Sequence, residues 1–501
     1  MQMTEDRIKI HDRYQFELKL GYSIDFSKSV TTYETDVYLF FPGNLGVDAE
    51  TYTRPDFYRD LQTYVRFKTP SYSLRQLASD SPLTPLSKLR CSCESLVNEN
   101  STNLRNEFEF QLKMFGCILK SSLRDHVSYI RKKSNSEDIA QLVDDYLDCV
   151  AIVTRNFRKL RSIINVPNIE DRIFSTYQFG DELMSQLIEK HTYKLLSQLK
   201  KRNLLSVLGS HDERLLDLVK REIQYRKKLH YPSIPDENGT NEVLLFRASV
   251  LKKFAESVLF LNARSKNESA ILEHFLMGSA AAISMTVALL ITYFVQLRFG
   301  AWTLPFFVVA IVGYAFKDRV KEIGRHFVSG NILKHLYDRA HDIRTSKKRK
   351  IGYNRERFEF LNEREVDNKV LKLRNRDHIT EIEDSLHGEM IIRYRKKITL
   401  ITDSVRKAFR DYPVNSVNDI SRFNIFKFLG RMDNPTKSLH VCGEKGWKKI
   451  SGHRTYHLNL VIRISHREHG IIFKRYRVIL DKDGIKRIEK VSSENEINSL
   501  L

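Results

Sequence analysis

Two long apolar runs dominate the pattern of hydrophobic and polar positions in this chain of 501 residues. The first, residues 275–295, has 21 positions without a charged side chain, and the second, residues 302–316, has 15. At about 1.5 Å of rise per residue, a helix over the first run can cross a hydrocarbon core of about 30 Å. The pattern therefore predicts a two-helix transmembrane hairpin over residues 275–316. The alternatives are a buried core helix for the first run and a re-entrant or interfacial helix for the second.

Small side chains recur along the first run at helical spacing. Gly278, Ala282 and Thr286 follow one another at steps of four, and Ala281 lies on the same side of the helix. Small residues let helix backbones approach closely in lipid, where no hydrophobic effect drives association. These four residues are the predicted helix-packing surface, against either the second helix or a neighbouring chain.

Residues 87–262 have the periodicity of helices and are expected to form a helical bundle domain. The clearest apolar seam repeats at alternating steps of four and three and comprises Ile139, Val143, Tyr146, Val150, Val153, Phe157, Leu160 and Ile164. Such a seam also fits a coiled coil between chains. Breaks at 165–167 and 232–239 contain proline or glycine and favour an antiparallel bundle within one chain.

Alternating apolar and polar residues predict β-strands near both ends of the chain. In the first part, residues 14–26 and 33–41 indicate a strand pair, so residues 1–75 are expected to form a small α+β domain. A proline- and serine-containing stretch at 69–86 has the composition of a linker.

The last part of the chain has the same alternation, with strands expected at 456–464, 471–480 and 484–491. Because their connections are short, these strands are expected to pair antiparallel within a β-rich domain over 351–501. The intervening residues 317–350 keep an amphipathic pattern and are expected to form a basic juxtamembrane helix. The expected fold class is therefore an α+β multidomain membrane protein: a small N-terminal β-containing region, a helical bundle, a transmembrane hairpin and a C-terminal β-rich domain.

Lysine and arginine predict the orientation of the hairpin. The short connection between the two apolar runs carries Arg298 alone, whereas the outer flanks carry Arg264, Lys266, Lys317, Arg319, Lys321 and Arg325. Positive residues favour the cytoplasmic side of a membrane. We therefore expect a multi-pass protein of the cell (inner) membrane with both termini in the cytoplasm.

Positive charge is concentrated after the hairpin, where 42 Lys and Arg face 25 Asp and Glu. The densest stretch holds five positive residues in seven positions: Arg344, Lys347, Lys348, Arg349 and Lys350. These residues are the predicted lipid-binding site for anionic headgroups of the bilayer. Nucleic acid is the alternative partner, and it is the less favoured one because the stretch begins close to the expected membrane.

Catalytic and cofactor motifs are missing from the sequence. There is no G-x-x-x-x-G-K-[ST], no H-E-x-x-H and no G-x-S-x-G, so no catalytic residue and no cofactor is predicted. His466 and His469 could offer two imidazoles to a metal, but their spacing matches no zinc module and exposed turn histidines explain them. The five cysteines form no framework and suggest reduced thiols in a cytoplasmic setting.

Together these features favour a two-span integral membrane protein that acts as a membrane-anchored cytoplasmic scaffold, with a protein partner or a homo-oligomer as its expected assembly. A membrane-tethered sensor or regulator, or a channel-like oligomer, is the second interpretation. An enzyme without a recognisable local motif is the third.

Overall fold

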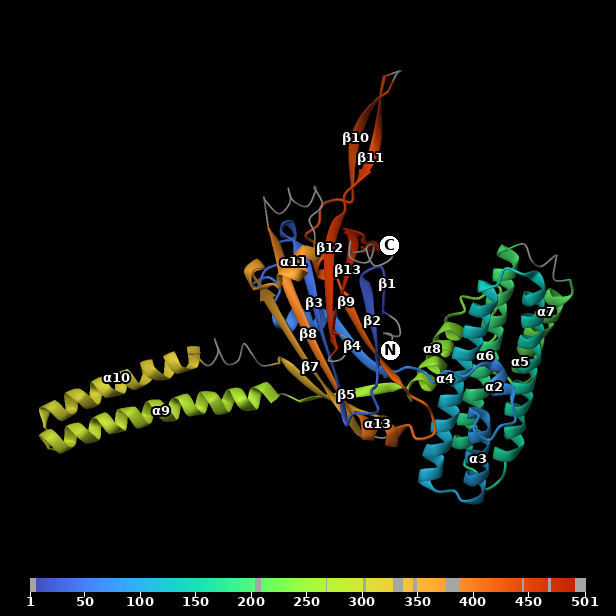
Figure 1. Cartoon of the computed structure of the whole chain (residues 1–501), viewed down its shortest axis with the longest axis horizontal. Helices are drawn as coiled ribbons and strands as arrows, with labels where there is room; N and C mark the ends of the chain where they lie inside the picture. The colour runs from blue at the N-terminus through green and yellow to red at the C-terminus, as the bar shows by residue number, and fades with distance from the viewer. Residues whose placement is uncertain are drawn as a thin grey trace. The chain divides into compact units, whose positions relative to one another are not determined.

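The computed structural model describes residues 6–202, 209–266, 268–300, 303–327, 337–345, 349–374, 388–443, 446–466 and 470–491. The chain divides into two units. The sheet unit comprises Met1–Val65, Asn262–Ala408 and Ser416–Leu501, and the helical unit comprises Arg66–Leu261 and Phe409–Asn415. The fold is mixed α+β, with helices, antiparallel sheets and a β-rich C-terminal region, as the sequence predicts (Figure 1).

The sheet unit is built on one large sheet with the strand order β1-β2-β9-β4-β5-β6-β7-β8-β3-β12-β13-β14. Its strands are β1 (Asp6–Asp12), β2 (Gln15–Ser23), β3 (Val30–Pro42), β4 (Leu61–Phe67), β5 (Phe260–Lys266), β6 (Arg339–Arg344), β7 (Lys350–Leu361), β8 (Glu389–Ile401), β9 (Ser416–Asn424), β12 (Tyr456–His466), β13 (Gly470–Asp481) and β14 (Gly484–Val491). A separate two-stranded ribbon, β10 (Thr436–Gly443) with β11 (Gly446–His453), is exposed along nearly its whole length.

Strands from the two ends of the chain pair with each other in this sheet. Strand β3 lies antiparallel to β8, from Val30 opposite Ile401 to Pro42 opposite Glu389, and antiparallel to β12 on its other side. Blue N-terminal strands accordingly lie beside orange and red ones in Figure 1. The expected division into an N-terminal domain over 1–75 and a C-terminal domain over 351–501 therefore differs from the structure. The expected pair of strands 14–26 and 33–41 also does not form, because each of these strands has partners from the second half of the chain.

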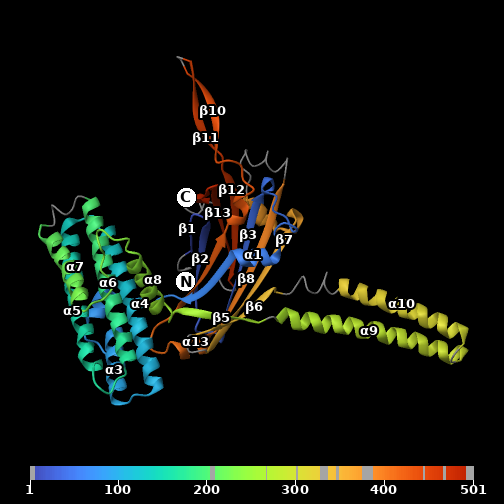
Figure 2. The same ribbon diagram turned by 180° about the vertical axis from the view of Figure 1, so that it is seen from behind.

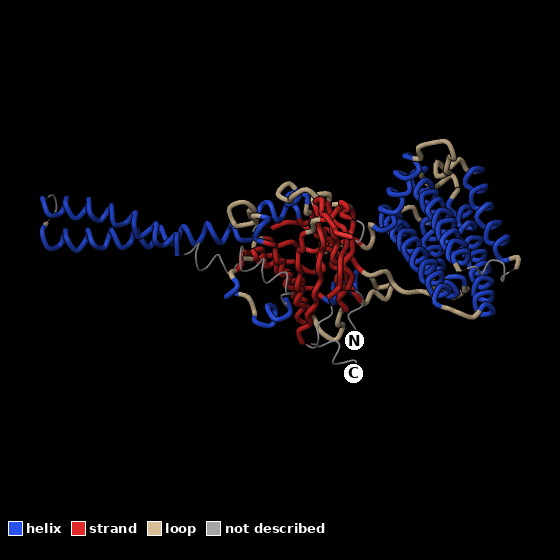
Figure 3. The backbone as a smooth tube through the Cα atoms, turned by 90° about the horizontal axis from the view of Figure 1, so that it is seen from above, coloured by secondary structure: helices blue, strands red, loops and turns tan. Residues whose placement is uncertain are grey.

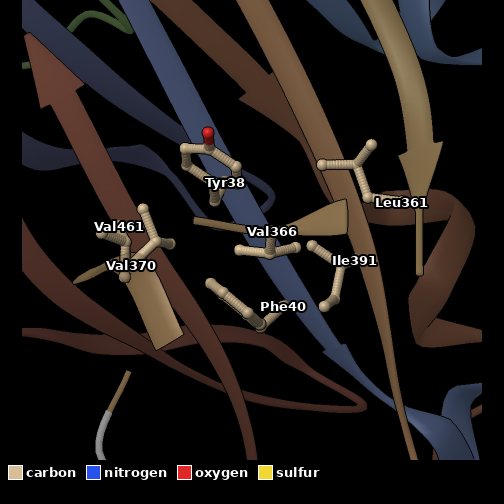
Figure 4. Packing of buried hydrophobic residues seen from close by; sticks show 7 residues of the cluster. All are labelled: Tyr38, Phe40, Leu361, Val366, Val370, Ile391 and Val461. Carbon is tan, nitrogen blue, oxygen red and sulfur yellow. The ribbon is translucent and has the colours of Figure 1, made fainter. Parts of the chain in front are cut away.

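A short helix packs on each face of the sheet. On one face Phe57 of α1 (Arg54–Asp60) contacts Phe358, Tyr394 and Phe423, at ring-centroid distances of 4.4, 5.5 and 5.8 Å. On the other face α11 (Asn368–Arg374) and Val366, two residues before it, contribute to an apolar cluster of Tyr38, Phe40, Leu361, Val366, Val370, Ile391 and Val461 (Figure 4). Because successive strand residues point to opposite faces, β3 and β8 supply side chains to both cores.

The sheet curls until its first and last strands approach each other. The backbone N–H of Ile485, in β14, donates to the carbonyl of Arg13 after β1, at 2.8 Å. Gly484 has φ +132°, and a Cβ there would lie 2.3 Å from that same carbonyl oxygen. A side chain at position 484 is therefore excluded both by the backbone conformation and by this close approach.

The helical unit contains α2 (Leu74–Ala78), α3 (Pro85–Asn98), α4 (Thr102–Lys132), α5 (Ser136–Ile164), α6 (Asp171–Lys201), α7 (His211–Lys228) and α8 (Glu242–Glu256). The long helices lie side by side in both side views (Figures 1 and 2), and Figure 3 shows them as a group of helices without strands. Local signals set their starts: the side chain of Asn135 caps α5 by accepting from the N–H of Glu137, and acidic residues occupy the first turn.

All eight residues of the predicted α5 seam are buried inside this unit, with at most 2% of any of them exposed. Phe157 stacks between Phe115 of α4 and Tyr177 of α6, at 5.2 and 5.3 Å between ring centroids. The seam thus serves packing within one chain. Side chains buried in this way are not available for a coiled coil between chains.

The hairpin consists of α9 (Glu268–Phe299) and α10 (Leu304–Phe327), which pack against each other. Gly300 ends α9 with φ +78°, a backbone conformation that favours glycine. Among the described residues, one helix is long and apolar enough to cross a membrane, and the window that meets this condition is Ala281–Arg298 of α9. The uncharged part of α10 is shorter, because charged residues begin at Lys317.

The segments that flank the hairpin differ from the sequence expectation. The helix preceding it ends at Glu256 and is followed by strand β5, which pairs with β6 from Asn262 to Lys266. After the hairpin, the helix expected over 317–350 is described only as far as Phe327, and β6 and β7 occupy residues 339–344 and 350–361. Ala340, Asp342 and Ile343 of β6 are buried, so this segment forms part of the sheet and not an amphipathic helix.

Candidate functional site

The hairpin exposes apolar side chains on nearly all sides. Only 6% of the window Ala281–Arg298 is buried, and Ile283 and Phe294 are 62% and 64% exposed. On α10, Leu304 and Ile311 are 79% and 70% exposed. Monomeric soluble proteins rarely expose a continuous apolar surface of this kind, and such surfaces mark contact with another protein or with a membrane.

Of the four predicted helix-packing residues, one is partly buried and three are exposed. Ala281 is half-buried, whereas Gly278, Ala282 and Thr286 are exposed, and a Cβ added at Gly278 would meet no atom within 4 Å. The side of α9 that is buried contains Ala281, Ser284, Ala288, Thr292 and Val295, with Ser284 at 2% exposure. Gly313 is buried on α10. Small residues do line the contact between the two helices, but the contacting side is rotated away from the predicted one.

Three of the five predicted lipid-binding residues are described, and none of them lies on a helix: Arg344 ends β6, Arg349 precedes β7 and Lys350 begins β7. The turn between β6 and β7 is closed by the N–H of Thr345, which donates to the carbonyl of Arg349 at 3.0 Å. Lys347 and Lys348 lie outside the described residues. The buried carboxylate of Asp342 pairs with both Arg344, at 3.1 Å, and Lys350, at 2.6 Å. One carboxylate therefore offsets part of the positive charge of this segment.

The register of β5 and β6 gives the position of this turn along the sheet. Helix α9 begins two residues after Lys266, which lies opposite Ala340, whereas Arg344 lies opposite Asn262 at the far end of the strand pair. At about 3.3 Å per residue, these four residues separate the turn from the start of the hairpin by roughly 13 Å along the strands. The described residues of the segment therefore lie away from the end of the sheet at which the chain enters α9.

The structure describes little of the predicted metal pair. His466 ends β12, but its side chain and the whole of His469 lie outside the described residues. Within the part of the chain that is described, no group of three or more His, Cys, Asp or Glu side chains could hold a metal ion.

A row of arginines and carboxylates crosses the sheet on the same face as α11. Register places Arg357 of β7, Arg395 of β8, Asp36 of β3 and Arg463 of β12 opposite one another in turn. The carboxylate of Asp36, with 1% of its side chain exposed, pairs with Arg395 at 2.7 Å and with Arg463 at 2.9 Å. In the next row the carboxylate of Glu359 pairs with both Arg357 and Arg393. We call Asp36, Arg357, Glu359, Arg393, Arg395 and Arg463 the arginine rows.

The arginine rows hold guanidinium groups in fixed orientations. Each carboxylate of the rows is shared by two arginines, and Glu34 also lies 3.6 Å from Arg395, so four arginines face three carboxylates and positive charge remains in excess. About a quarter of the Arg395 and Arg463 side chains stays exposed, at 25% and 26%. A planar guanidinium with oriented N–H donors is well suited to bind carboxylate or phosphate groups in pairs. This face could therefore recognise an acidic partner.

Sequence reasoning missed the arginine rows, although a signal was present. Residues 355–359 read RERFE and residues 393–397 read RYRKK, so a charged side chain stands at every second position of each segment. This alternation shows that the charges share one face. It does not show that Asp36, more than 300 residues earlier in the chain, lies between Arg395 and Arg463.

The opposite face buries a second charged group. The ammonium of Lys396 lies 2.6 Å from Asp419 and 3.7 Å from Glu356, and all three side chains are almost fully buried. Asn354 and Thr63 donate to the Glu356 carboxylate at 2.7 and 3.2 Å. Burial raises the pKa of Asp419 despite the attraction of Lys396. A buried charge whose partners are all supplied by the fold acts chiefly to fix strand positions, and we assign this group that structural role.

Comparison with other proteins gives no family to which the chain can be assigned: no family model, no curated protein and no solved structure matches it. Its function has to be inferred from these surfaces alone.

Proposed function

We propose that this chain is a two-span integral membrane protein of the cell (inner) membrane that holds its sheet unit and helical unit in the cytoplasm as a non-enzymatic interaction scaffold. The apolar surface of the α9–α10 hairpin carries the proposal. Water would have to solvate side chains such as Ile283, Phe294 and Leu304 on every side of two long helices, which is unfavourable by about 25 cal/mol for each Å² of apolar area. Lipid removes that cost.

Two features support a return of the chain through α10. Because α10 packs along α9, a crossing of the membrane by α9 places α10 in the membrane as well. Lys317 lies with its ammonium 4.0 Å from the ring centroid of Tyr314, as expected of a side chain that extends along an aromatic ring at the interface. Short apolar segments can be accommodated by local thinning of the bilayer.

The direct test of anchoring is extraction of the membrane fraction with alkaline carbonate. The full chain should stay with the membrane, because a spanning helix is not released by removing peripheral contacts. A matched variant in which Ile283, Leu290 and Phe294 are replaced by Ser keeps the helix length and lowers its apolarity, and it should appear in the soluble or aggregated fraction. Release of the unaltered chain by carbonate would contradict the proposal.

The arginine rows support an interaction role for the sheet unit, with an acidic protein surface as the partner. A photo-crosslinking residue placed at Arg357 should capture a distinct partner or a second copy of the chain. The same residue placed at Glu109, an outward position in the helical unit, is the matched control. If both positions give the same products, the arginine rows are an internal ion network only.

Anionic headgroups remain the proposed ligands of the segment from Arg344 to Lys350. In nanodiscs that contain phosphatidylglycerol, amides near Arg349 should exchange hydrogen more slowly than in nanodiscs of phosphatidylcholine. The effect should be small, because electrostatic attraction decays within about 8 Å at physiological salt and Asp342 offsets part of the charge. Equal exchange in both lipids, together with binding of duplex DNA or RNA, would replace lipid with nucleic acid as the partner.

A further inference from the structure

The helical unit contains a cavity of about 330 Å³ between α4, α6, α8 and the loop that precedes α8. Its wall is largely apolar, with Leu183, Leu187, Leu244 and Ala248 among the lining residues. Leu245 also lines it and is 68% exposed, so the cavity opens to solvent beside apolar side chains of α8. A site of this size and character is typical of small-molecule pockets, in which a few polar groups orient an apolar ligand.

Two polar groups in the wall have no hydrogen-bond partner within the described residues. The hydroxyl of Ser233 is one of them, and only 1% of this residue is exposed. The amide nitrogen of Gln186 is the other. Buried polar groups normally have a partner, and an unsatisfied one costs about 1–3 kcal/mol. Both groups can donate a hydrogen bond, so they would be satisfied by an acceptor inside the cavity.

Charged side chains of the wall leave a positive surplus. The two acidic ones are already neutralised: Glu256 pairs with Lys120 at 2.6 Å, and Glu189 pairs with the buried guanidinium of Arg226. Lys190 and Lys252 have no ion-pair partner in the described part of the chain. Glu256 raises the pKa of Lys252, but partial desolvation of this exposed side chain and nearby positive charges outweigh that effect and hold the pKa below its usual value. A negatively charged group of a ligand would therefore be electrostatically favourable beside these two lysines.

We propose that this cavity binds a single-chain amphiphile with an anionic headgroup, such as a fatty-acid carboxylate or an alkyl phosphate. The chain of the ligand would lie against the leucines, and its headgroup would accept hydrogen bonds from Ser233 and Gln186 and face Lys190 and Lys252. A metal cation is disfavoured by the same lysines. The thiol of Cys117 also lines the cavity, but burial raises its pKa to about 12, so it is not a nucleophile toward the ligand.

This inference does not depend on the membrane crossing of the hairpin. It supports the alternative role of a sensor, because a ligand that fills the space between α4, α6 and α8 would stabilise the packing of these helices. By linkage, a ligand that binds the folded unit alone stabilises it in proportion to the logarithm of its concentration.

The test is hydrogen exchange of the full chain in phosphatidylcholine nanodiscs, followed by mass spectrometry of peptides from α4, α6 and α8. The probes are dodecanoate and dodecyl phosphate, which differ in headgroup, dodecanol, which has no charge, and inorganic phosphate, which has no chain. We expect dodecanoate or dodecyl phosphate to slow exchange in α8 about tenfold at saturation. Dodecanol should do so only weakly, and inorganic phosphate should have no effect.

Two variants locate the site. Lys190→Gln with Lys252→Gln removes the charge at two exposed positions and should weaken dodecanoate binding about tenfold while leaving dodecanol unchanged. Ala248→Phe fills the cavity and should abolish protection by every probe. Equal protection by dodecanol and dodecanoate, or undiminished dodecanoate binding in the double Gln variant, would overturn the anion assignment. No protection of the unaltered chain by any probe would overturn the site itself.

Discussion

Helices α5 and α9 have similar lengths, 29 and 32 residues, but they distribute apolar side chains in opposite ways. In α5 the apolar residues form one seam that is buried against neighbouring helices, and charged residues occupy the remaining sides. In α9 apolar residues surround the helix over 275–295 and most of them are exposed. The distribution around a helix thus tells which medium surrounds it: a seam implies protein on one side and water on the other, whereas uniform apolarity implies that water is absent.

The comparison predicts its largest effect for an aromatic ring in the α5 seam. Phe157→Ala should destabilise the helical unit by about 3–5 kcal/mol, because it leaves a cavity between Phe115 and Tyr177. The matched change Phe294→Ala removes the same ring from an exposed position of α9 and should leave the helical unit unaffected. Hydrogen exchange of α5 amides measures the free energy of unfolding in both variants. Similar values for the two would remove the distinction between the helices.

An arginine introduced into each of the two helices should have a large effect in α9 and little effect in α5. Leu290→Arg puts a guanidinium near the middle of the apolar window, where it costs about 2.5–3.5 kcal/mol in a membrane helix. We expect the membrane-inserted fraction to fall several-fold, as measured by carbonate extraction. Ile152→Arg, at a partly exposed position of α5 away from the seam, should not alter insertion or stability. Unchanged insertion of Leu290→Arg would indicate that α9 does not contact hydrocarbon.

Polar groups buried in the helical unit should make it sensitive to acid. Burial, reinforced by nearby lysines, lowers the pKa of His191 on α6 to about 4. Below about pH 6.5 the unfolded chain therefore binds a proton at His191, whereas the folded unit does not until about pH 4. The free energy of unfolding has its full value above pH 6.5 and falls as the pH drops toward 4. The loss should reach about 3 kcal/mol for this group. His191→Leu should flatten the decline between pH 6.5 and 4, measured by thermal unfolding, whereas an unchanged decline would assign it to other groups.

The smallest effect concerns the two sides of α9. Ser284→Leu inserts a larger side chain into the contact with α10 and should weaken hairpin packing by about 1–3 kcal/mol. Ala282→Leu, on an exposed side, should leave packing within the hairpin intact. The mobility of the hairpin in detergent gels distinguishes the two. If Ala282→Leu alone weakens oligomers of the chain, the exposed small residues mediate contact between chains, as first expected for Gly278 and its neighbours.

The spacing of apolar residues along the sequence predicted many of the individual helices and strands, but not how they assemble. The seam from Ile139 to Ile164 and the strands near 456–491 are present as expected, since periodicity of 3.6 or 2 is set by residues close in sequence. The assembly of the sheet was not predictable, because the pairing of β3 with β8 joins residues 347 to 371 positions apart. Arg344 illustrates the consequence, since its basic neighbours resemble a surface helix until the pairing with Asn262 is known.

The candidate sites follow the same rule. The exposed apolar surface of α9 could be predicted from composition alone, because it requires no partner residue. The orientation of that helix toward α10 could not be predicted, and for this reason the expected contact was placed at Gly278, whereas Ser284 is the residue buried there. The arginine rows and the cavity bring together side chains from three or more elements, so their sequence positions give no sign of proximity.

One measurement tests membrane crossing most directly: the side of the membrane on which the connection between α9 and α10 lies. Single cysteines at Gly300, before Asp6 and after Val491 can be labelled in intact cells or spheroplasts with a membrane-impermeant maleimide, in a chain whose native cysteines are replaced. We predict that the cysteine at position 300 is labelled from outside, whereas the two terminal ones react only after the membrane is permeabilised. Labelling of position 300 only after permeabilisation would contradict the two-span topology.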